Sequence, residues 1–166
     1  MLYIFDKDKT IVGGPDNRPA NTPEEQHPLP GVIEIIAALR AAGHQVAIAS
    51  NQGGVAWGFI TVAQAQSLVK DAAAKIGGVD FWRCSCYDER ARAKNPDSPY
   101  ARKSYRRKPK PGMLKELMRA AGATPASTMM IGDSEDDRKA AEAAGIKFEY
   151  ANTFFNTKWP VEAKEI

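Results

Sequence analysis

The sequence has few cysteines, no long apolar run and no nucleotide-binding loop of the P-loop kind. Its two cysteines, Cys84 and Cys86, are one residue apart, so a disulfide between them would be strained and would join nothing distant. No stretch approaches the roughly 20 apolar residues that a transmembrane helix needs, and the chain does not open on a charged leader followed by an apolar stretch. These absences predict a cytoplasmic protein with reduced thiols. The missing G-x-x-x-x-G-K-[ST] pattern argues against an attached P-loop kinase.

The remaining composition is typical of a folded domain. Of the 166 residues, 43% are hydrophobic and 26% are charged, which is ordinary for a globular protein. We therefore predict one domain over residues 1–166. The net charge of +3 conceals an uneven distribution, because residues 90–110 hold nine Lys or Arg and one acid, Asp97. This basic loop, placed at about residues 88–110, favours a phosphorylated or polyanionic partner. The alternative is a solvated, mobile loop.

Apolar runs and helical patterns alternate along the chain. Strands are predicted at residues 2–5, 45–49, 81–87, 128–131 and 146–150, and helices at 31–42, 61–76, 111–121 and 135–144, with Thr61 as a cap. This alternation predicts an α/β fold, a three-layer sandwich with a mostly parallel, Rossmann-like sheet. The Gly- and Pro-rich residues 13–30 predict a loop too short for a separate cap domain. Phe154, Phe155 and Trp159 are expected to pack back on the domain.

Polar residues gather where the predicted strands end, which is the edge at which open α/β sheets bind ligands. The four clusters are Asp6 with Asp8, Ser50 with Asn51, the region before Lys108, and Asp133. Acids that face each other from two strand ends repel unless a cation lies between them. Oxygen-only ligands of this kind suit Mg²⁺, which also contacts substrate phosphate. The pattern therefore predicts a magnesium site at this edge.

Four motifs in order resemble those of the haloacid dehalogenase superfamily. They read FDKDKT (5–10), ASN (49–51), RKPKPG (107–112) and IGDSEDD (131–137). Each lies at a predicted strand end or helix start, and together they span nearly the whole chain. Any one of them alone is a weak signal. The resemblance implies the HAD-like fold and a Mg²⁺-dependent phosphatase that works through an aspartyl-phosphate.

The same resemblance implies a role for each motif residue. Asp6 would be the nucleophile, and Asp8 the general acid and base. Lys108 would stabilise the phosphoryl group. The implied metal ligands are the carboxylates of Asp6 and Asp133 with the backbone carbonyl of Asp8.

Further residues are implied as supports and phosphate ligands. The Ser50 hydroxyl and the Asn51 backbone N–H would bind the phosphoryl group, and Arg107 matches an arginine that contacts substrate in the capless branch of the family. Thr10 closes the first motif, and Asp137 resembles the acid that steadies the lysine or the waters of the metal.

Taken singly, these residues have simpler interpretations. Asp8 and Asp133 fit turns and helix caps, Ser50-Asn51 fits a turn, and Lys108 is one charge in a basic run. Only the joint arrangement favours catalysis. One departure from the family pattern is Lys9, which stands where Gly is common.

The segments SNQGGVAWGFIT (50–61) and RRKPKPGML (106–114) resemble the capless branch that includes heptose-bisphosphate, histidinol-phosphate and polynucleotide 3′-phosphatases. The heptose-bisphosphate and histidinol-phosphate members commonly hold a structural zinc, but here only Cys84 and Cys86 could serve, and two thiolates do not close a four-ligand site. Zinc is therefore not expected. The missing zinc ligands weaken the case for a heptose-bisphosphate enzyme, whereas tyrosines in and beside the basic loop favour nucleic-acid ends. Both substrates stay open.

Two hypotheses from other classes compete with the phosphatase. A phospho-accepting receiver domain uses similar residues, but its acid pair lies on a strand apart from its acceptor. A non-catalytic nucleic-acid-binding module would use the basic loop and would keep its binding after Asp6→Asn. The intact set of acids favours the enzyme. No membrane or protein partner is indicated.

Overall fold

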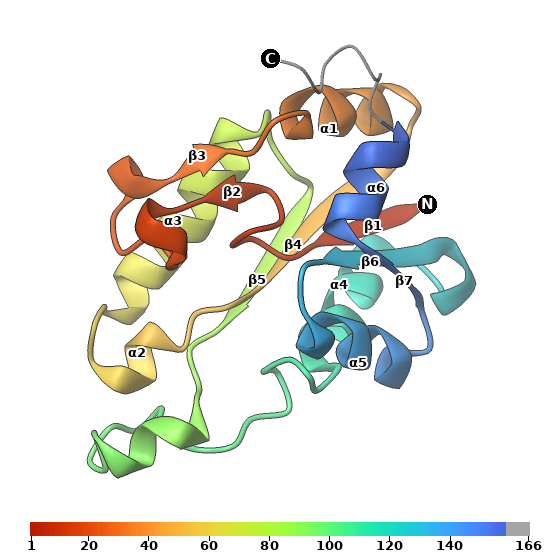
Figure 1. The fold of residues 1–166 in the computed structure, drawn as a ribbon. Coiled ribbons are helices and arrows are strands. Elements are labelled where there is room, and N and C mark those ends of the chain that lie inside the picture. Colours follow the sequence, from red (N-terminus) through yellow and green to blue (C-terminus); the bar gives the residue numbers. More distant parts are fainter. Residues whose placement is uncertain (159–166) are drawn as a thin grey trace.

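The computed structural model describes residues 1–158, and a five-stranded parallel sheet forms its centre (Figure 1). The order across the sheet is β5-β4-β1-β6-β7, so the first strand is central. The strands are β1 (Leu2–Phe5), β4 (Gln45–Asn51), β5 (Phe81–Ser85), β6 (Thr128–Gly132) and β7 (Lys147–Tyr150). Central parallel strands are buried on both faces, and all four residues of β1 are buried. The apolar run at the start of the sequence therefore becomes the middle of the fold.

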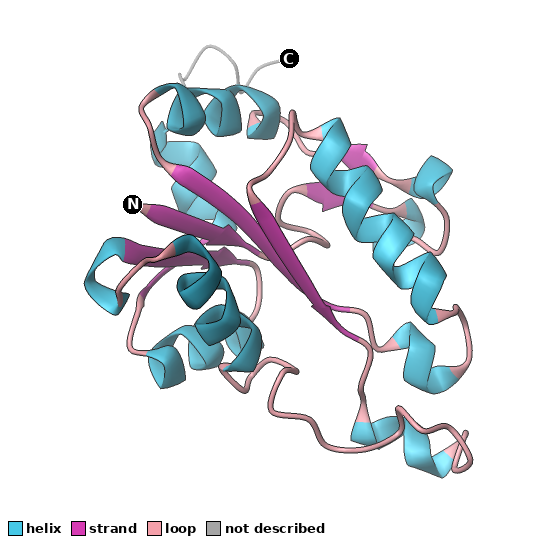
Figure 2. Ribbon diagram, turned by 180° about the vertical axis from the view of Figure 1, so that it is seen from behind, coloured by secondary structure: helices cyan, strands magenta, loops and turns pink. Residues whose placement is uncertain are grey.

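Helices cover both faces of the sheet (Figure 2). The helices are α1 (Val32–Ala41), α2 (Gly54–Trp57), α3 (Val62–Lys75), α4 (Gly112–Ala121), α5 (Glu135–Ala144) and α6 (Ala151–Lys158). One core packs α1, α3 and α6 on the face that carries Tyr3 and Phe5, and the other packs α4 and α5 on the face that carries Leu2 and Ile4. Alternate side chains of β1 thus serve opposite layers. The predicted three-layer α/β sandwich is confirmed, and residues 1–158 form no separate cap domain.

Most predicted elements are present, and the exceptions are short. Thr61 caps α3 as predicted. Its side chain accepts a hydrogen bond from Gln64 N, and the Gln64 side chain accepts one from Thr61 N. The expectation of a loop throughout residues 13–30 is wrong: β2 (Val12–Gly13) pairs with β3 (His27–Pro28), and two short 3₁₀ helices lie between them (Pro15–Asn17 and Pro23–Glu25). A two-residue strand carries no alternation by which it could be recognised.

The chain end packs on the sheet as expected where it is described. Phe154 is fully buried, and its ring lies 5.7 Å from that of Phe5 and 6.0 Å from that of Tyr3. Phe155 stacks on Phe5 at 6.0 Å. Trp159 lies outside the described residues.

The chain leaves the sheet after β5 and returns only at α4, as an extended segment with one 3₁₀ helix (Glu89–Ala93) (Figure 2). Most of the basic loop lies in this segment, beyond the carboxyl ends of the strands. In residues 1–158, no helix is both long enough and apolar enough to span a membrane.

Candidate active site

Asp6 lies at the carboxyl end of the central strand, where its backbone N–H donates to Ile131 O at 2.9 Å. The chain then turns sharply, with Lys7 O accepting from the N–H groups of Ile11 and Val12. Lys9 takes part in this turn with φ of 64°, a left-handed conformation that favours glycine. This backbone explains why glycine is common at this point of the motif, and why Lys9 is a departure that costs about 1 kcal/mol.

Lys108 contacts two acids, Asp6 at the end of β1 and Asp137 in α5. Its Nζ donates to Asp6 Oδ1 at 2.7 Å, to Asp137 Oδ1 at 2.6 Å and to Ala49 O at 2.8 Å, and the residue is 2% exposed. Burial alone would lower the pKa of Lys108, but the two carboxylates raise it above its usual range. The ammonium is therefore held permanently charged beside Asp6, where it can face a phosphoryl oxygen.

The expectation that Lys108 follows a strand end is wrong. It lies on the segment that returns to α4, and its side chain reaches back to the sheet edge. The Asn51 side chain fixes that segment, because its Nδ2 donates to Lys108 O at 2.9 Å and its Oδ1 accepts from Lys108 N at 3.0 Å. Asn51 thus has a positioning contact that sequence reasoning missed, since the two residues are 57 positions apart.

Asp137 supports the lysine from the first turn of α5. Its second oxygen accepts from Ser134 N at 3.2 Å and from Ser134 Oγ at 2.9 Å, so both oxygens are engaged. A side chain at Gly132 would bring its Cβ to 2.4 Å from Asp137 Cγ, which explains the glycine in the fourth motif. Ser134, not Asp133, caps the helix, so the simple cap interpretation of Asp133 is wrong.

Three carboxylates meet beside the lysine. Oxygens of Asp6, Asp133 and Asp137 lie within 4.8 Å of one another. Burial, followed by the charge of Asp6, raises the pKa of Asp133 to about 7, as expected for acids crowded together. The donors are all oxygen, which fits Mg²⁺. Both oxygens of Asp137 are held by Lys108 and Ser134, at 2.6, 2.9 and 3.2 Å, whereas the second oxygen of Asp6 has only a longer contact of 3.3 Å with Thr10 Oγ1. Asp6 and Asp133 are therefore the better ligands of the three.

Asp8 sits beside the acids but has its own partners. Its Oδ1 accepts from Lys7 Nζ at 2.7 Å, and its Oδ2 accepts from Gln52 Nε2 at 3.4 Å. The same Gln52 nitrogen donates to the buried Ser50 Oγ at 2.7 Å. The structure thus brings Asp8 and Ser50 to the same edge as Asp6. Thr10 Oγ1 also reaches Asp6, at 3.3 Å from Oδ2.

Lys7 is a site residue that sequence reasoning missed. It is fully buried, and its Nζ also donates to Gln26 Oε1 at 2.5 Å. Gln26 in turn donates to Leu68 O and to Asp71 Oδ2, both at 2.9 Å. The signal for Lys7 in the sequence was its position between two acids after a buried strand. A lysine is seldom buried unless it is paired with an acid or another acceptor.

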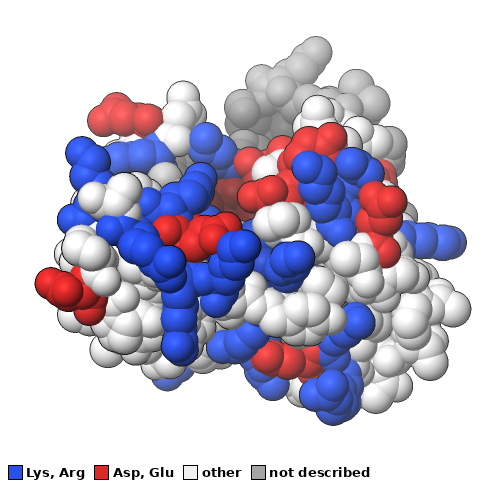
Figure 3. Space-filling model, turned by 90° about the horizontal axis from the view of Figure 1, so that it is seen from below, with Lys and Arg blue, Asp and Glu red and all other residues white. Residues whose placement is uncertain are grey.

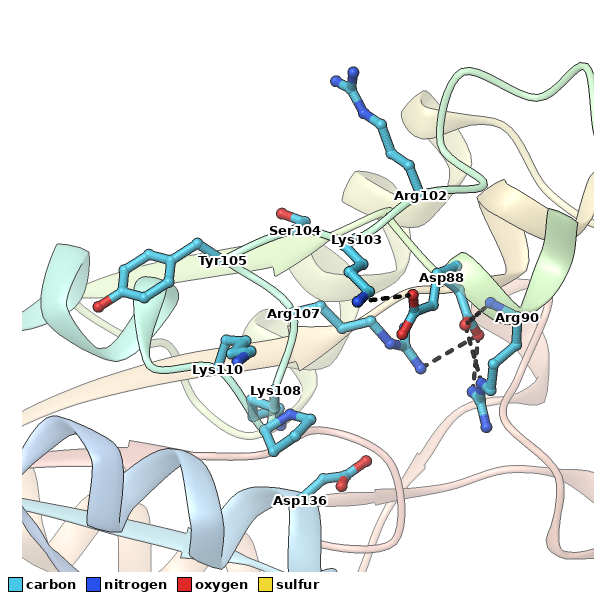
Figure 4. A pocket seen from close by; sticks show the side chains of 12 residues that line it. Asp88, Arg90, Arg102, Lys103, Ser104, Tyr105, Arg107, Lys108, Lys110 and Asp136 are labelled. Atoms are coloured by element: carbon cyan, nitrogen blue, oxygen red, sulfur yellow. Dashed lines mark hydrogen bonds and ion pairs between the residues drawn. The ribbon is translucent and has the colours of Figure 1, made fainter.

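A pocket of about 590 Å³ opens beside Lys108 and is lined largely by the basic loop (Figure 4). Its charged lining residues are Asp88, Glu89, Arg90, Arg102, Lys103, Arg107, Lys108, Lys110 and Asp136. Figure 3 shows Lys and Arg side chains crowding much of the molecule's lower face around a small group of acids. The predicted substrate residue Arg107 lines this pocket, and its Nη1 donates to Tyr87 O at 2.9 Å.

Comparison with known proteins gives the family. Residues 6–145 match the model of the haloacid dehalogenase-like hydrolases. This chain belongs to that family. It is a phosphatase, as its motifs predicted, and this is confirmed by its relatives, which are named phosphatases.

One curated relative is the D-glycero-beta-D-manno-heptose-1,7-bisphosphate 7-phosphatase of Neisseria meningitidis serogroup A. It is 32% identical over 153 residues, which cover 88% of this chain and 74% of the relative. One solved structure is the D,D-heptose 1,7-bisphosphate phosphatase of B. bronchiseptica, complexed with magnesium and phosphate. Its TM-score is 0.72 at 27% identity, and the match covers 95% of this chain and 86% of the B. bronchiseptica chain. A HAD-like phosphatase from Mesorhizobium loti has a TM-score of 0.77 at 25% identity. The match covers 87% of this chain and 68% of the M. loti chain.

Proposed function

We propose that this phosphatase is a Mg²⁺-dependent phosphomonoester hydrolase that acts on a sugar phosphate through an aspartyl-phosphate at Asp6. The observation that carries the proposal is the placement of Lys108 between Asp6 and Asp137, beside the Asp133 carboxylate. The buried ammonium of Lys108 contacts the carboxylate that would attack. The catalytic unit in this proposal is one domain over residues 1–166.

The main electrostatic barrier in the proposed reaction is the repulsion between the attacking carboxylate and the phosphate. Bringing a carboxylate to about 4 Å from a phosphate charge costs roughly 4 kcal/mol per charge pair at an effective dielectric of 20. Lys108 offsets part of this cost because its ammonium is fixed at 2.7 Å from Asp6 Oδ1. Mg²⁺ held by Asp6, Asp133 and the backbone carbonyl of Asp8 would supply the remaining charge neutralisation and orient the phosphate.

Asp6 and Asp8 have different roles in the two steps of the proposed reaction. Asp6 attacks phosphorus and forms the aspartyl-phosphate. Asp8 protonates the leaving oxygen, and afterwards takes a proton from the water that hydrolyses the intermediate. For this, Asp8 has to exchange its contact with Lys7 or Gln52 for one with substrate. Ser50 and the Asn51 N–H hold the phosphoryl oxygens.

The relatives favour a sugar phosphate over the alternatives. The curated relative and the B. bronchiseptica structure are both named for a heptose bisphosphate, and the magnesium complex of the latter supports the same cofactor here. The pocket beside Lys108 opens wide enough for a sugar and is rich in cations. Polynucleotide 3′-ends remain the second candidate, since the basic loop could also follow a nucleic-acid backbone.

A phosphatase screen with Mg²⁺ and EDTA arms tests the proposal. The substrates are sugar bisphosphates and monophosphates, histidinol phosphate, nucleotides and 3′-phosphorylated oligonucleotides. We expect the highest kcat/KM on a sugar phosphate, and loss of activity in EDTA and in Asp6→Asn. The matched control is Asp97→Asn, an exposed acid in the basic loop. Full activity in EDTA would refute the metal, full activity in Asp6→Asn would refute the nucleophile, and a clear preference for the oligonucleotide would refute the substrate.

A further inference from the structure

Lys7 carries a fully buried ammonium to which no proposed step gives a role. Its Nζ donates to Asp8 Oδ1 at 2.7 Å and to Gln26 Oε1 at 2.5 Å. Removing an ammonium from water costs several kcal/mol unless its partners are well placed. A methionine would fill a similar volume without that cost, so filling space does not explain a lysine at this position. Its contacts point to a role at Asp8.

Gln26 ties the ammonium to α3. Its Nε2 donates to Leu68 O and to Asp71 Oδ2, both at 2.9 Å, so both amide hydrogens are used by this helix. A reversed amide would turn two donors toward Lys7 Nζ, which is itself a donor, so the orientation of the amide is fixed. Gln26 is also buried, and water does not compete for these bonds. The packing of α3 therefore sets where the Lys7 ammonium lies.

The two oxygens of Asp8 are held unequally. Oδ1 accepts the short, charge-assisted bond from Lys7, whereas Oδ2 has only the 3.4 Å contact with Gln52 Nε2, which is long for a hydrogen bond. Gln52 Nε2 also donates to Ser50 Oγ at 2.7 Å, so it keeps a good partner when Oδ2 turns to substrate. Substrate can therefore displace Gln52 from Oδ2 at little cost, but it cannot as readily displace Lys7 from Oδ1.

Oδ2 is also the oxygen nearer to the proposed phosphoryl site. Ser50 is proposed to hold a phosphoryl oxygen, and one Gln52 nitrogen contacts both Ser50 Oγ and Asp8 Oδ2. Oδ1 is instead occupied by the buried Lys7. We therefore expect the leaving oxygen of a bound phosphate ester on the Oδ2 side of Asp8.

We propose that Lys7, anchored by Gln26, is a positioning residue for the general acid: it holds Oδ1 of Asp8, so that Oδ2 is the oxygen that transfers the proton. In the first step the proton passes from Oδ2 to the leaving oxygen as the P–O bond breaks. The electron pair of that bond stays on the oxygen, and a neutral alcohol departs. In the second step Oδ2 takes a proton from the water that attacks the aspartyl-phosphate, and Asp6 leaves as a carboxylate. The inference rests on the proposed phosphatase reaction.

The test compares three substrates of similar size that differ in leaving group: p-nitrophenyl, phenyl and benzyl phosphate. p-Nitrophenolate departs without a proton, whereas the benzyl alkoxide needs one, so a misplaced acid slows the benzyl ester most. The parameter is kcat/KM, because it reports the reaction only as far as phosphoryl transfer to Asp6. Asp8→Asn sets the scale, and its loss on benzyl phosphate should exceed its loss on p-nitrophenyl phosphate by about 100-fold or more.

Two variants then displace Asp8 without replacing it. Lys7→Met removes the donor to Oδ1, and its loss on benzyl phosphate should exceed its loss on p-nitrophenyl phosphate by about tenfold or more, because small misplacements of a catalytic group are costly. Gln26→Leu leaves Lys7 in place but removes its anchor, and should show the same pattern at about three- to tenfold. The test therefore does not depend on whether Lys7→Met folds well.

Lys75→Met is the matched control. Lys75 Nζ donates to Pro23 O at 2.6 Å and to Gln26 O at 3.1 Å, so its loss loosens the same segment without removing a contact of Asp8. Its effects on the three substrates should be equal. Circular dichroism and thermal denaturation report the folding of each variant.

Two outcomes would overturn the inference. In one, Lys7→Met and Gln26→Leu lose activity equally on all three substrates while Asp8→Asn does not. In the other, Lys75→Met shows the leaving-group dependence of Lys7→Met, because a loosened segment would then explain it. The proposed function fails differently: equal losses for Asp8→Asn on all three substrates would remove Asp8 as the acid, and a wild type inactive on all three would refute the proposed reaction. Either result would refute the inference as well.

Discussion

Asp133→Asn should stabilise the metal-free protein while it removes metal binding. The substitution keeps the size of the side chain and deletes one of three carboxylates that lie within 4.8 Å of one another. Lys108 pairs with Asp6 and Asp137 but not with Asp133. Burial and the charge of Asp6 raise the pKa of Asp133 from 3.8 to about 7. The folded, metal-free protein therefore holds this carboxylate at a cost.

The sign and size of the effect follow from the raised pKa. Between about pH 4 and pH 7 the folded state binds a proton that the unfolded state has lost, so the free energy of unfolding falls as pH rises through this window. The full shift would be worth about 4 kcal/mol, but Asp133, although it lies against the other two carboxylates, still reaches solvent, and solvent screening reduces the effect to about 1–2 kcal/mol. At pH 8 in EDTA the variant should melt about 2–8 °C above the wild type.

Thermal denaturation at pH 5 and pH 8, with EDTA or Mg²⁺, measures the effect. In EDTA the difference between the variant and the wild type should be small at pH 5 and large at pH 8. Saturating Mg²⁺ should stabilise the wild type by about 2.7 kcal/mol at 100 times its Kd, and the variant far less. Asp97→Asn serves as the control. If Asp133→Asn proves less stable than the wild type at pH 8 in EDTA, Asp133 has a structural role in its turn and the electrostatic reasoning is wrong.

Three further substitutions test other parts of the molecule. Asp6→Asn should lower kcat by about 10⁴-fold or more with the fold retained; steady-state kinetics and circular dichroism check this, and residual activity near the wild-type level would contradict it. Lys108→Met leaves Asp137 buried without its cation and should cost about 3–5 kcal/mol of unfolding free energy in urea titrations, together with activity. Thr61→Ala removes the cap of α3 and should cost about 1 kcal/mol with kcat unchanged, since Thr61 lies outside the acid cluster; a lower kcat would contradict this.

The sheet and the main acids could be predicted from the sequence because each has a local signal. The buried run before Asp6 shows as four consecutive apolar residues, and helical spacing identifies α1 and α3. Motif order then placed Asp6 and Asp133 at the same edge of the sheet, where the structure brings them together. These predictions succeeded because the ends of strands and the starts of helices show in the sequence as places where the spacing of apolar residues changes.

Contacts between segments far apart in the chain could not be predicted in this way. Lys7 depends on Gln26, 19 positions later, and Lys108 depends on Asn51, 57 positions earlier. Neither pair has a periodic signature. Asp88 has no signal of its own in the sequence, and only the folded chain shows that arginines and a tryptophan converge on it. The β2–β3 pair was missed because two residues cannot show an alternation.

The central place of β1 in the sheet has a consequence for how such an enzyme can diversify. The strand that presents Asp6 is paired on both sides, with β4 and with β6, so its amides should be among the slowest to exchange with solvent and should open only with the whole domain. The pocket rim lies instead on the segment between β5 and α4, outside the sheet. Mutations on this segment, other than at Lys108, can accumulate without loosening the strand that presents Asp6, the proposed nucleophile. Selection can therefore change which phosphate ester is accepted while the chemistry is inherited intact.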